Sequence, residues 1–144
     1  MSESPSIALV TGGNRGIGLA IAQSLKAAGH RVVITYRSGT PPEGFDAVQM
    51  DVTSSESVDA GFSKIESEIG QPEIIVANAG ITKDRTLLKM SQEEWDDVIS
   101  INLTGVFNCT QAVAPVMKEQ NYGRIVSASS NVAIRGNYGQ TNYV

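Results

Sequence analysis

The stretch TGGNRGIG, residues 11–18, decides how the chain is interpreted, because it joins an apolar β-rich run to a segment with helical periodicity. Its glycines lie at positions 12, 16 and 18. A diphosphate needs close approach of the backbone and free amides at a helix N-terminus, and side chains at these glycines would obstruct both. The Gly-Lys-Ser/Thr ending of a Walker phosphate loop is absent. The stretch predicts a phosphate-binding turn, with a ligand-free glycine turn as the alternative.

Strand-like and helix-like segments alternate along the rest of the chain. The expected strands span residues 7–11, 31–36, 46–52, 73–80 and 124–129. Helical patterns separate them, and each crossover helix of a parallel sheet packs back onto the sheet. The alternation therefore predicts an α/β fold with a doubly wound, Rossmann-type parallel sheet. In such sheets ligands bind beyond the carboxyl ends of the strands.

Helix boundaries can also be predicted. The segment 16–29 is expected to carry one apolar face, made of Ile17, Ile21, Leu25 and Ala28. Thr53 with Glu56 and Ser91 with Glu94 have the spacing of capping boxes. The first box would begin a helix with the apolar face Val58, Phe62, Ile65 and Ile69. The second would begin a long helix that carries Trp95, Val98 and Ile99 and runs toward Met117. Pro115 is expected to bend or break the latter.

Composition narrows the class of protein. The 144 residues suit one domain, 1–144, and are 41% hydrophobic and 18% charged, as in globular proteins. A net charge of -4 favours neither nucleic acid nor an anionic membrane. Cys109 is the only cysteine, so the chain cannot form an internal disulfide. No apolar run is long enough to span a membrane, and MSESPS lacks the basic and apolar regions of a signal peptide. A cytoplasmic protein is predicted, without a metal, since His30 and Cys109 are isolated.

The segment after the second expected strand, TYRSG, bears on the choice of dinucleotide. An acidic residue there would hydrogen-bond the free ribose hydroxyl of NAD. This chain has Arg37 at that point and Arg15 inside the glycine turn, so two cations could hold a 2′-phosphate. NADP (NADPH) is therefore the predicted cofactor, and the alternative is that both arginines are solvated surface groups.

TGGNRGIG, the DV pair at 51–52 and ANAG at 77–80 together resemble the short-chain dehydrogenase/reductase family over the whole chain. The family usually has two asparagines before Ala-Gly, whereas Ala77 replaces the first here. The resemblance implies that Asp51 and Val52 lie at the adenine and that Asn78 to Gly80 form the floor of the site. The implied cofactor-binding residues are Gly12, Asn14, Arg15, Gly16, Ile17, Gly18, Arg37, Asp51, Val52, Asn78, Ala79 and Gly80.

The same resemblance supplies three members of a catalytic set: Asn102 in INLTGVF, Ser130 in SASSNVAIRG and Tyr143 in QTNYV. Ser130 rather than Ser129 matches, because the family's serine precedes its tyrosine by 13 positions. A ketone that accepts hydride develops negative charge on oxygen, so a serine can donate a hydrogen bond to it while a tyrosine delivers the proton. Asn102 would act through ordered water. The alternatives are a loop serine and a packed aromatic ring.

In this family a lysine four residues after the tyrosine assists its ionisation; that position would be 147, beyond Val144. The chain is therefore expected to be the N-terminal part of a longer protein, with an incomplete sheet in which residues 124–129 form an edge strand.

The stretch from ANAGITKDRTLLKM to INLTGVFN, with GNYGQTNY, resembles the 3-oxoacyl-acyl-carrier-protein reductases of fatty-acid synthesis. The implied function is NADPH-dependent reduction of 3-oxoacyl-acyl-carrier-protein to the 3-hydroxyacyl form in fatty-acid biosynthesis. The implied partners are a carrier-protein-bound or CoA-bound 3-oxoacyl substrate and, if the chain is longer, further copies of itself in a homo-oligomer. Acetoacetyl-CoA or carbonyl reduction, and an inactive NADP-binding module, are the alternatives. Lys83, Arg85 and Arg135 are candidates for a basic patch that docks an acidic carrier.

Overall fold

Five parallel strands form one sheet in the order β3-β2-β1-β4-β5 in this computed structural model, which describes residues 5–144. The strands are β1 (Ile7–Val10), β2 (Arg31–Tyr36), β3 (Asp46–Gln49), β4 (Ile74–Ala77) and β5 (Arg124–Ser127). The predicted doubly wound α/β class is confirmed, with strands up to four residues shorter than expected. Residues 1–4, which belong to the MSESPS segment, lie outside the described residues.

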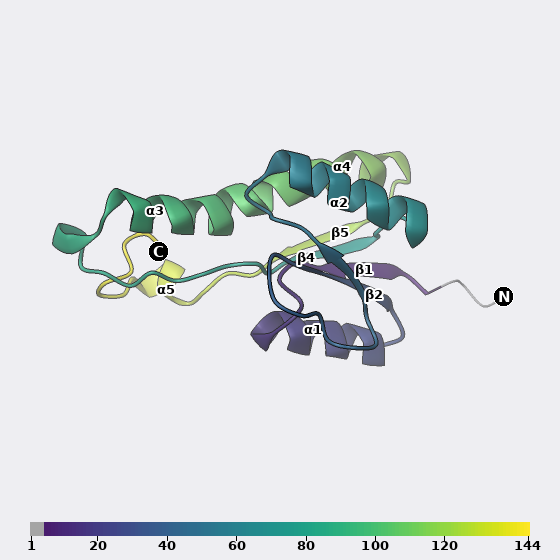
Figure 1. Cartoon of the computed structure of the whole chain (residues 1–144), viewed down its shortest axis with the longest axis horizontal. Helices are drawn as coiled ribbons and strands as arrows, with labels where there is room; N and C mark the ends of the chain where they lie inside the picture. Colours follow the sequence, from purple (N-terminus) through teal and green to yellow (C-terminus); the bar gives the residue numbers. More distant parts are fainter. Residues whose placement is uncertain (1–4) are drawn as a thin grey trace.

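Helices cover both faces of the sheet (Figure 1). The helix α1 (Gly16–Ala27) packs on one face, where Ala22 joins a core of small and β-branched strand residues. The helices α2 (Ser55–Glu68) and α4 (Gly105–Glu119) pack on the other face, where Phe62, Ile65, Cys109 and Val113 are buried. The chain passes from one face to the other between β1 and β4, so a crevice opens at the carboxyl ends of these two strands.

The apolar face predicted for α1 is only partly correct. The fully enclosed residues of this helix are Gly18 and Ala22, while Ile21 and Leu25 are partly buried. Ile17, in the first turn, is 75% exposed. The small residues allow close contact between the helix and the sheet, and Ile17 is left at the open end where the crevice lies. The face predicted for α2 is confirmed, since Val58, Phe62 and Ile65 are buried and Ile69 packs against them.

The predicted capping box at Thr53 is wrong. Ser54 is the N-cap of α2, and its hydroxyl accepts a hydrogen bond from the Ser57 backbone N–H. Thr53 cannot take this role because its backbone N–H and hydroxyl both donate to the Asp51 carboxylate, at 2.9 and 2.8 Å. A local bond between neighbouring side chain and backbone has displaced the helix start by one residue.

The long helical stretch is interrupted, but not at Pro115. The capping box of Ser91 and Glu94 is present and starts α3 (Gln92–Ile99). A π-helical segment, η2 (Ser100–Thr104), joins α3 to α4, which continues through Pro115 to Glu119. The break or bend expected at Pro115 is therefore replaced by a π-bulge ten or more residues earlier, a feature frequently found at functional sites.

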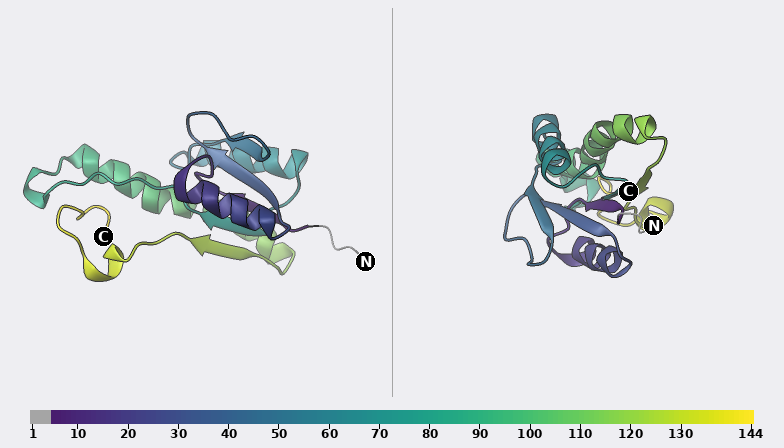
Figure 2. Two further views of the ribbon diagram at one scale, coloured as in Figure 1. Left: turned by 90° about the horizontal axis from the view of Figure 1, so that it is seen from below. Right: turned by 90° about the vertical axis from the view of Figure 1, so that its right-hand side faces the viewer.

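The strand β5 lies at the edge of the sheet, as expected, and its Ile125 and Val126 are 43% and 50% exposed. Beyond it the chain continues alongside α3 (Figure 2) and includes the short helix α5 (Val132–Arg135), which was not predicted. Figure 2 shows this C-terminal segment beside α3, extending away from the strands. A 3₁₀ turn, η1 (Leu87–Lys89), precedes α3.

Candidate functional site

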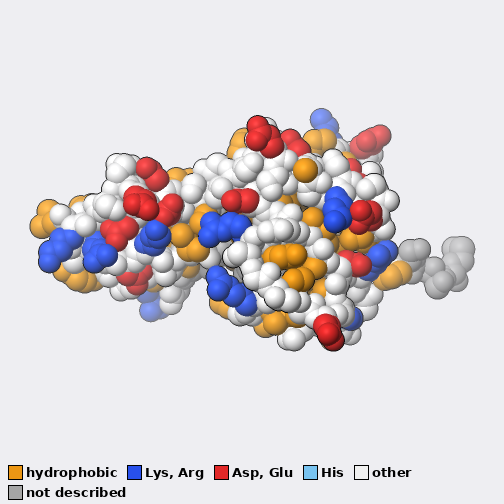
Figure 3. All heavy atoms as spheres, in the orientation of Figure 1, with side chains coloured by type: hydrophobic (Ala, Val, Ile, Leu, Met, Phe, Trp, Pro, Cys, Tyr) orange, Lys and Arg blue, Asp and Glu red, His pale blue; other side chains and the backbone are white. Residues whose placement is uncertain are grey.

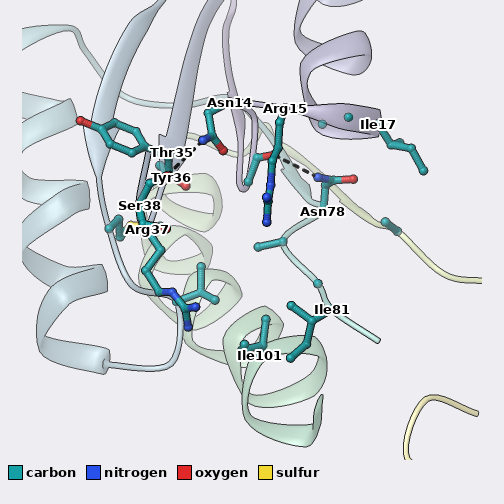
Figure 4. Close-up of a pocket in the computed structure, with 18 of the residues that line it drawn as sticks. Asn14, Arg15, Ile17, Thr35, Tyr36, Arg37, Ser38, Asn78, Ile81 and Ile101 are labelled. Carbon is teal, nitrogen blue, oxygen red and sulfur yellow. Dashed lines mark hydrogen bonds between the residues drawn. The ribbon is translucent and has the colours of Figure 1, made fainter. Parts of the chain in front are cut away.

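A cleft of about 670 Å³ opens where the carboxyl ends of β1, β2, β3 and β4 meet (Figure 4). Segments far apart in the sequence contribute to its walls, as the sheet order requires. All twelve residues that the sequence analysis assigned to cofactor binding line the cleft, together with Tyr143 from the other end of the chain. The twelve are Gly12, Asn14, Arg15, Gly16, Ile17, Gly18, Arg37, Asp51, Val52, Asn78, Ala79 and Gly80.

The glycine turn is shaped so that its backbone faces the cleft. Gly12 and Gly16 have positive φ angles of 63° and 56°, which side chains disfavour. A Cβ on Gly18 would lie 2.2 Å from the Gly12 carbonyl oxygen and 2.5 Å from the Asn78 amide nitrogen. No side chain caps the first turn of α1, and that turn contains no acidic residue. Its amides and the positive end of the helix dipole therefore remain available to an anion.

Thr11 joins the glycine turn to the end of β4, and the sequence analysis did not single it out. Its hydroxyl oxygen accepts hydrogen bonds from the backbone N–H groups of Asn78 and Ala79, each at 3.0 Å. In return, the Asn78 side-chain amide donates to the Thr11 carbonyl at 3.1 Å. These reciprocal bonds fix the two loops on either side of the crevice. The tendency of threonine to bond nearby backbone was the available signal, but the partner is 67 residues away.

We expect Thr11→Val to lower the free energy of unfolding by about 2 kcal/mol, because two amides lose their acceptor. Thr35→Val is the matched control: both threonines are 1% exposed, but the Thr35 hydroxyl has no hydrogen-bond partner in residues 5–144. Its replacement should be neutral or slightly stabilising, since a buried unpaired hydroxyl is removed. Urea unfolding of both variants checks this, and equal losses would contradict the assigned role of Thr11.

Arg15 and Arg37 reach into the same hollow from two different loops (Figure 4). Neither forms an ion pair with another residue of the range 5–144. The Asn14 side-chain amide donates to the Ser38 carbonyl at 3.2 Å, and Gln49 donates to the Arg37 carbonyl at 3.0 Å. The first bond holds the loop after β2 against the glycine turn, and the second ties the same loop to β3. Two guanidinium groups without carboxylate partners make this end of the cleft suitable for an anion.

Asp51 and Val52 lie on a loop that α4 fixes from behind. The Asn108 side-chain amide donates to the Val52 carbonyl at 2.9 Å, and the Asp51 N–H donates to the Ser57 hydroxyl at 3.0 Å. A Cβ on Gly105 would lie 2.7 Å from the Val52 side chain, so α4 approaches this loop as closely as a glycine permits. Asn108 is thus a supporting residue that sequence reasoning missed, since no pattern connects it with residue 52.

The pKa of the Asp51 carboxyl is lowered, chiefly because the Thr53 backbone N–H donates to it, with the Thr53 hydroxyl and Arg37 adding to the effect against the opposing influence of burial. A folded-state pKa below the unfolded value stabilises the fold above the unfolded pKa, and this stabilisation is lost as pH falls through the folded pKa. We expect the difference in unfolding free energy between the wild type and Asp51→Asn to shrink on acidification below about pH 5. Urea titrations at several pH values measure it, and a pH-independent difference would contradict the expectation.

Asn102 lies in η2 and clamps the loop that follows β4. Its side-chain oxygen accepts from the Ile81 N–H and its amide donates to the Ile81 carbonyl, both at 2.9 Å. The clamp lies next to Gly80, whose hypothetical Cβ would be 3.4 Å from the Asn102 oxygen. The side-chain amide is therefore occupied by backbone, which makes Asn102 a residue that positions the floor of the cleft.

A second cavity of about 330 Å³ brings the three predicted catalytic residues together: Asn102, Ser130 and Tyr143 all line it. Tyr143 and Ser129 line both this cavity and the cleft, whereas Ser130 lines only the smaller one. The Ser130 hydroxyl accepts from the Val132 N–H at 3.4 Å, a long bond that leaves its own hydrogen free. Tyr143 thus lies at the junction of the two spaces.

Other candidates have structural explanations. Lys83 pairs with Asp97 and Arg85 pairs with Glu94. Figure 3 shows positive and negative side chains interspersed at the α3 end of the molecule, on the left, so Lys83 and Arg85 of the predicted basic patch are already paired with carboxylates, whereas Arg135 forms no ion pair within residues 5–144. Cys109 is buried in α4, and burial raises the pKa of its thiol to about 12. Within residues 5–144 there is no group of three or more potential metal ligands and no helix long and apolar enough to cross a membrane.

The chain belongs to the short-chain dehydrogenase family, whose model matches residues 6–144. Among curated proteins it is 46% identical to the 3-oxoacyl-(acyl-carrier-protein) reductase MabA of Mycobacterium avium, a match that covers 94% of this chain and 53% of the relative. It is 42% identical to an acetoacetyl-CoA reductase of Shinella zoogloeoides and to the 3-oxoacyl-(acyl-carrier-protein) reductase FabG of Staphylococcus aureus, each match covering 95% of this chain. The chain spans 60% and 61% of these two relatives, respectively.

Proposed function

We propose that this chain provides the dinucleotide site and the proton donor of an NADPH-dependent reductase that converts 3-oxoacyl thioesters to 3-hydroxyacyl thioesters in the cytoplasm. The observation that carries the proposal is the position of Tyr143, which lines both the cleft of the glycine turn and the cavity that holds Ser130. The names of the relatives support an acyl carrier protein or CoA as the thioester carrier.

The residues of the cleft fit a pyridine dinucleotide phosphate. A Cβ on Gly18 would clash with the Gly12 carbonyl oxygen and the Asn78 amide, so the start of α1 packs directly against the two loops of the cleft, whereas the space around Gly16 is open. The free amides of α1 suit the diphosphate, and Arg15 with Arg37 suits a 2′-phosphate. Asp51 and Val52 would contact the adenine, and Asn78 to Gly80 would lie beneath the nicotinamide ribose. When bound, NADPH supplies the hydride.

The chain's own residues supply the proton and the orientation. Tyr143 donates its phenolic proton to the ketone oxygen as negative charge develops there. Ser130 uses its free hydroxyl hydrogen to hold the same oxygen, which stabilises that charge. Asn102 keeps the loop of residues 78–81 in register through Ile81. The reaction thus needs a bound thioester in the smaller cavity and the dinucleotide in the cleft.

Arg37 tests the cofactor choice. We expect Arg37→Asp to raise the Kd of NADPH by about 10- to 100-fold, because a charge-assisted bond to the 2′-phosphate is lost. The Kd of NADH should change little or fall. The control is Lys64→Asp, which makes the same change in charge on the exposed face of α2. Titration of cofactor fluorescence gives the Kd of NADPH and of NADH for the wild type and both variants, and equal changes for NADPH and NADH in Arg37→Asp would exclude a role for Arg37 in recognising the phosphate.

The carrier is tested by comparing kcat/KM for the same 3-oxoacyl group on acyl carrier protein and on CoA. A higher value for the carrier-protein thioester supports fatty-acid synthesis, and a preference for acetoacetyl-CoA supports the alternative that the Shinella relative suggests.

We also propose that the protein is a homo-oligomer. Leu103 in η2 and Phe107 in α4 are 64% and 58% exposed, which suits a subunit contact. Light scattering distinguishes this from a monomer.

A further inference from the structure

Asn142, the residue before Tyr143, is one of three buried polar residues in the range 5–144, and it is only 5% exposed. Its side-chain amide nitrogen donates to two backbone carbonyls, those of Lys83 and Glu94, both at 3.0 Å. These carbonyls are 59 and 48 residues away in the sequence. The orientation of the amide follows from its partners, since the reverse orientation would place oxygen against two oxygens.

The side-chain oxygen of Asn142, Oδ1, is buried and has no hydrogen-bond partner among residues 5–144. An unpaired buried acceptor costs about 1 to 3 kcal/mol. A buried polar group with this cost needs an explanation in a native structure. The two donated bonds give one, because an amide is the small side chain that offers two hydrogens to two carbonyls at once.

Both acceptors belong to a well-anchored part of the molecule. The Glu94 carboxylate caps α3 and pairs with Arg85. The segment that contains Asn142 is also tied to this anchor by its neighbours: the Arg85 N–H donates to the Gly139 carbonyl at 2.7 Å, and the Gln140 amide donates to the Asp84 carboxylate at 3.1 Å. Asn142 makes the last of these attachments before the tyrosine.

Tyr143 has few restraints of its own. Its backbone N–H donates to the Gln140 carbonyl at 2.9 Å, a bond inside the same turn. The next residue toward the N-terminus that connects it to another part of the structure is Asn142. The position of Tyr143 relative to Ser130 and Asn102 therefore depends on the Asn142 amide.

We propose that Asn142 is a positioning residue for the proton donor: its two bonds to Lys83 and Glu94 hold the Tyr143 phenol at the junction of the cleft and the smaller cavity. This inference rests on the proposed function, in which Tyr143 delivers the proton. Asn142 itself lines the smaller cavity but not the cleft, so we expect its loss to act mainly on the chemical step and much less on dinucleotide binding.

The test is a double-mutant cycle on the purified protein with NADPH and acetoacetyl-CoA. Asn142→Ala should lower kcat by about 10- to 100-fold, since misplacing a reacting group by about 1 Å has an effect of this size. The Kd of NADPH should stay at the wild-type value. In the Tyr143→Phe background the same change should have no further effect on kcat, because a residue that acts only through the phenol has nothing left to position.

Asn137→Ala is the matched control, since Asn137 is exposed on the same segment and its amide bonds only the Gln140 side chain. It should keep the wild-type kcat. If Asn142→Ala does not fold, Asn142→Ser replaces it; a serine hydroxyl can serve one carbonyl, and an intermediate kcat is expected. Wild-type kcat in the folded Asn142 variant, or equal losses in both backgrounds, would overturn the inference. Full activity of Tyr143→Phe would instead overturn the proposed function.

Discussion

Tyr143→Phe should reduce kcat for a 3-oxoacyl thioester by about 100- to 10,000-fold, the range in which a positioned general acid contributes. Phenylalanine keeps the ring of Tyr143, a residue that lines both cavities, and removes only the hydroxyl. The change in packing is therefore small, and the Kd of NADPH and the unfolding free energy should stay near their wild-type values.

The measurement is steady-state consumption of NADPH with acetoacetyl-CoA, combined with a fluorescence titration of the cofactor. Tyr138→Phe is a suitable control, because Tyr138 is 87% exposed and lines neither cavity. Both variants lose one phenolic hydroxyl, and only the Tyr143 variant should lose turnover. If the two variants are equally active, the proton comes from another group.

Gly18→Ala should be the most damaging change in the dinucleotide cleft. The added Cβ would lie 2.2 Å from the Gly12 carbonyl oxygen and 2.5 Å from the Asn78 amide, so backbone as well as side chain must move. Overpacking of this kind costs about 1 to 3 kcal/mol or more. The displaced atoms belong to the two loops that face the dinucleotide, and we expect the Kd of NADPH to rise by at least about 10-fold.

Gly29→Ala provides the comparison for Gly18→Ala. Gly29 has a φ of 93° and no atom within 4 Å of a hypothetical Cβ, and it lies beyond the end of α1, outside the cleft. Its substitution should cost about 1 kcal/mol in backbone strain and leave the Kd of NADPH unchanged. Isothermal titration together with thermal unfolding separates the two effects. A Gly18→Ala protein that binds NADPH as tightly as the Gly29→Ala protein would contradict the assigned role of the turn.

Local patterns were sufficient to predict the sheet and most helices. Short apolar runs between helical segments predicted the strands. The capping box at Ser91 is confirmed, because Ser91 and Glu94 lie within one helical turn. Thr53 failed as a cap because Asp51, two residues away, engages its N–H and hydroxyl. The break predicted at Pro115 is wrong, because α4 continues through this residue. No sequence pattern predicted the π-helical segment η2. Competing local bonds and tertiary packing decided these cases.

The residues that support the site were harder to predict than those that line it. Glycines and asparagines of the cleft lie in recognisable motifs, whereas Thr11, Asn108 and Asn142 act through partners 48 to 68 residues away. Each of these side chains forms a hydrogen bond with a backbone group, which every residue type carries, so the sequence does not show which residue is the partner. The fold had to be known before these three contacts could be found.

The most direct test of the proposed function is whether the purified protein consumes NADPH in the presence of acetoacetyl-CoA and forms 3-hydroxybutyryl-CoA in equal amount. We predict stoichiometric conversion, with NADPH strongly preferred to NADH. Tight binding of NADPH without any consumption would contradict the account and would instead support a dinucleotide-binding module without catalytic activity.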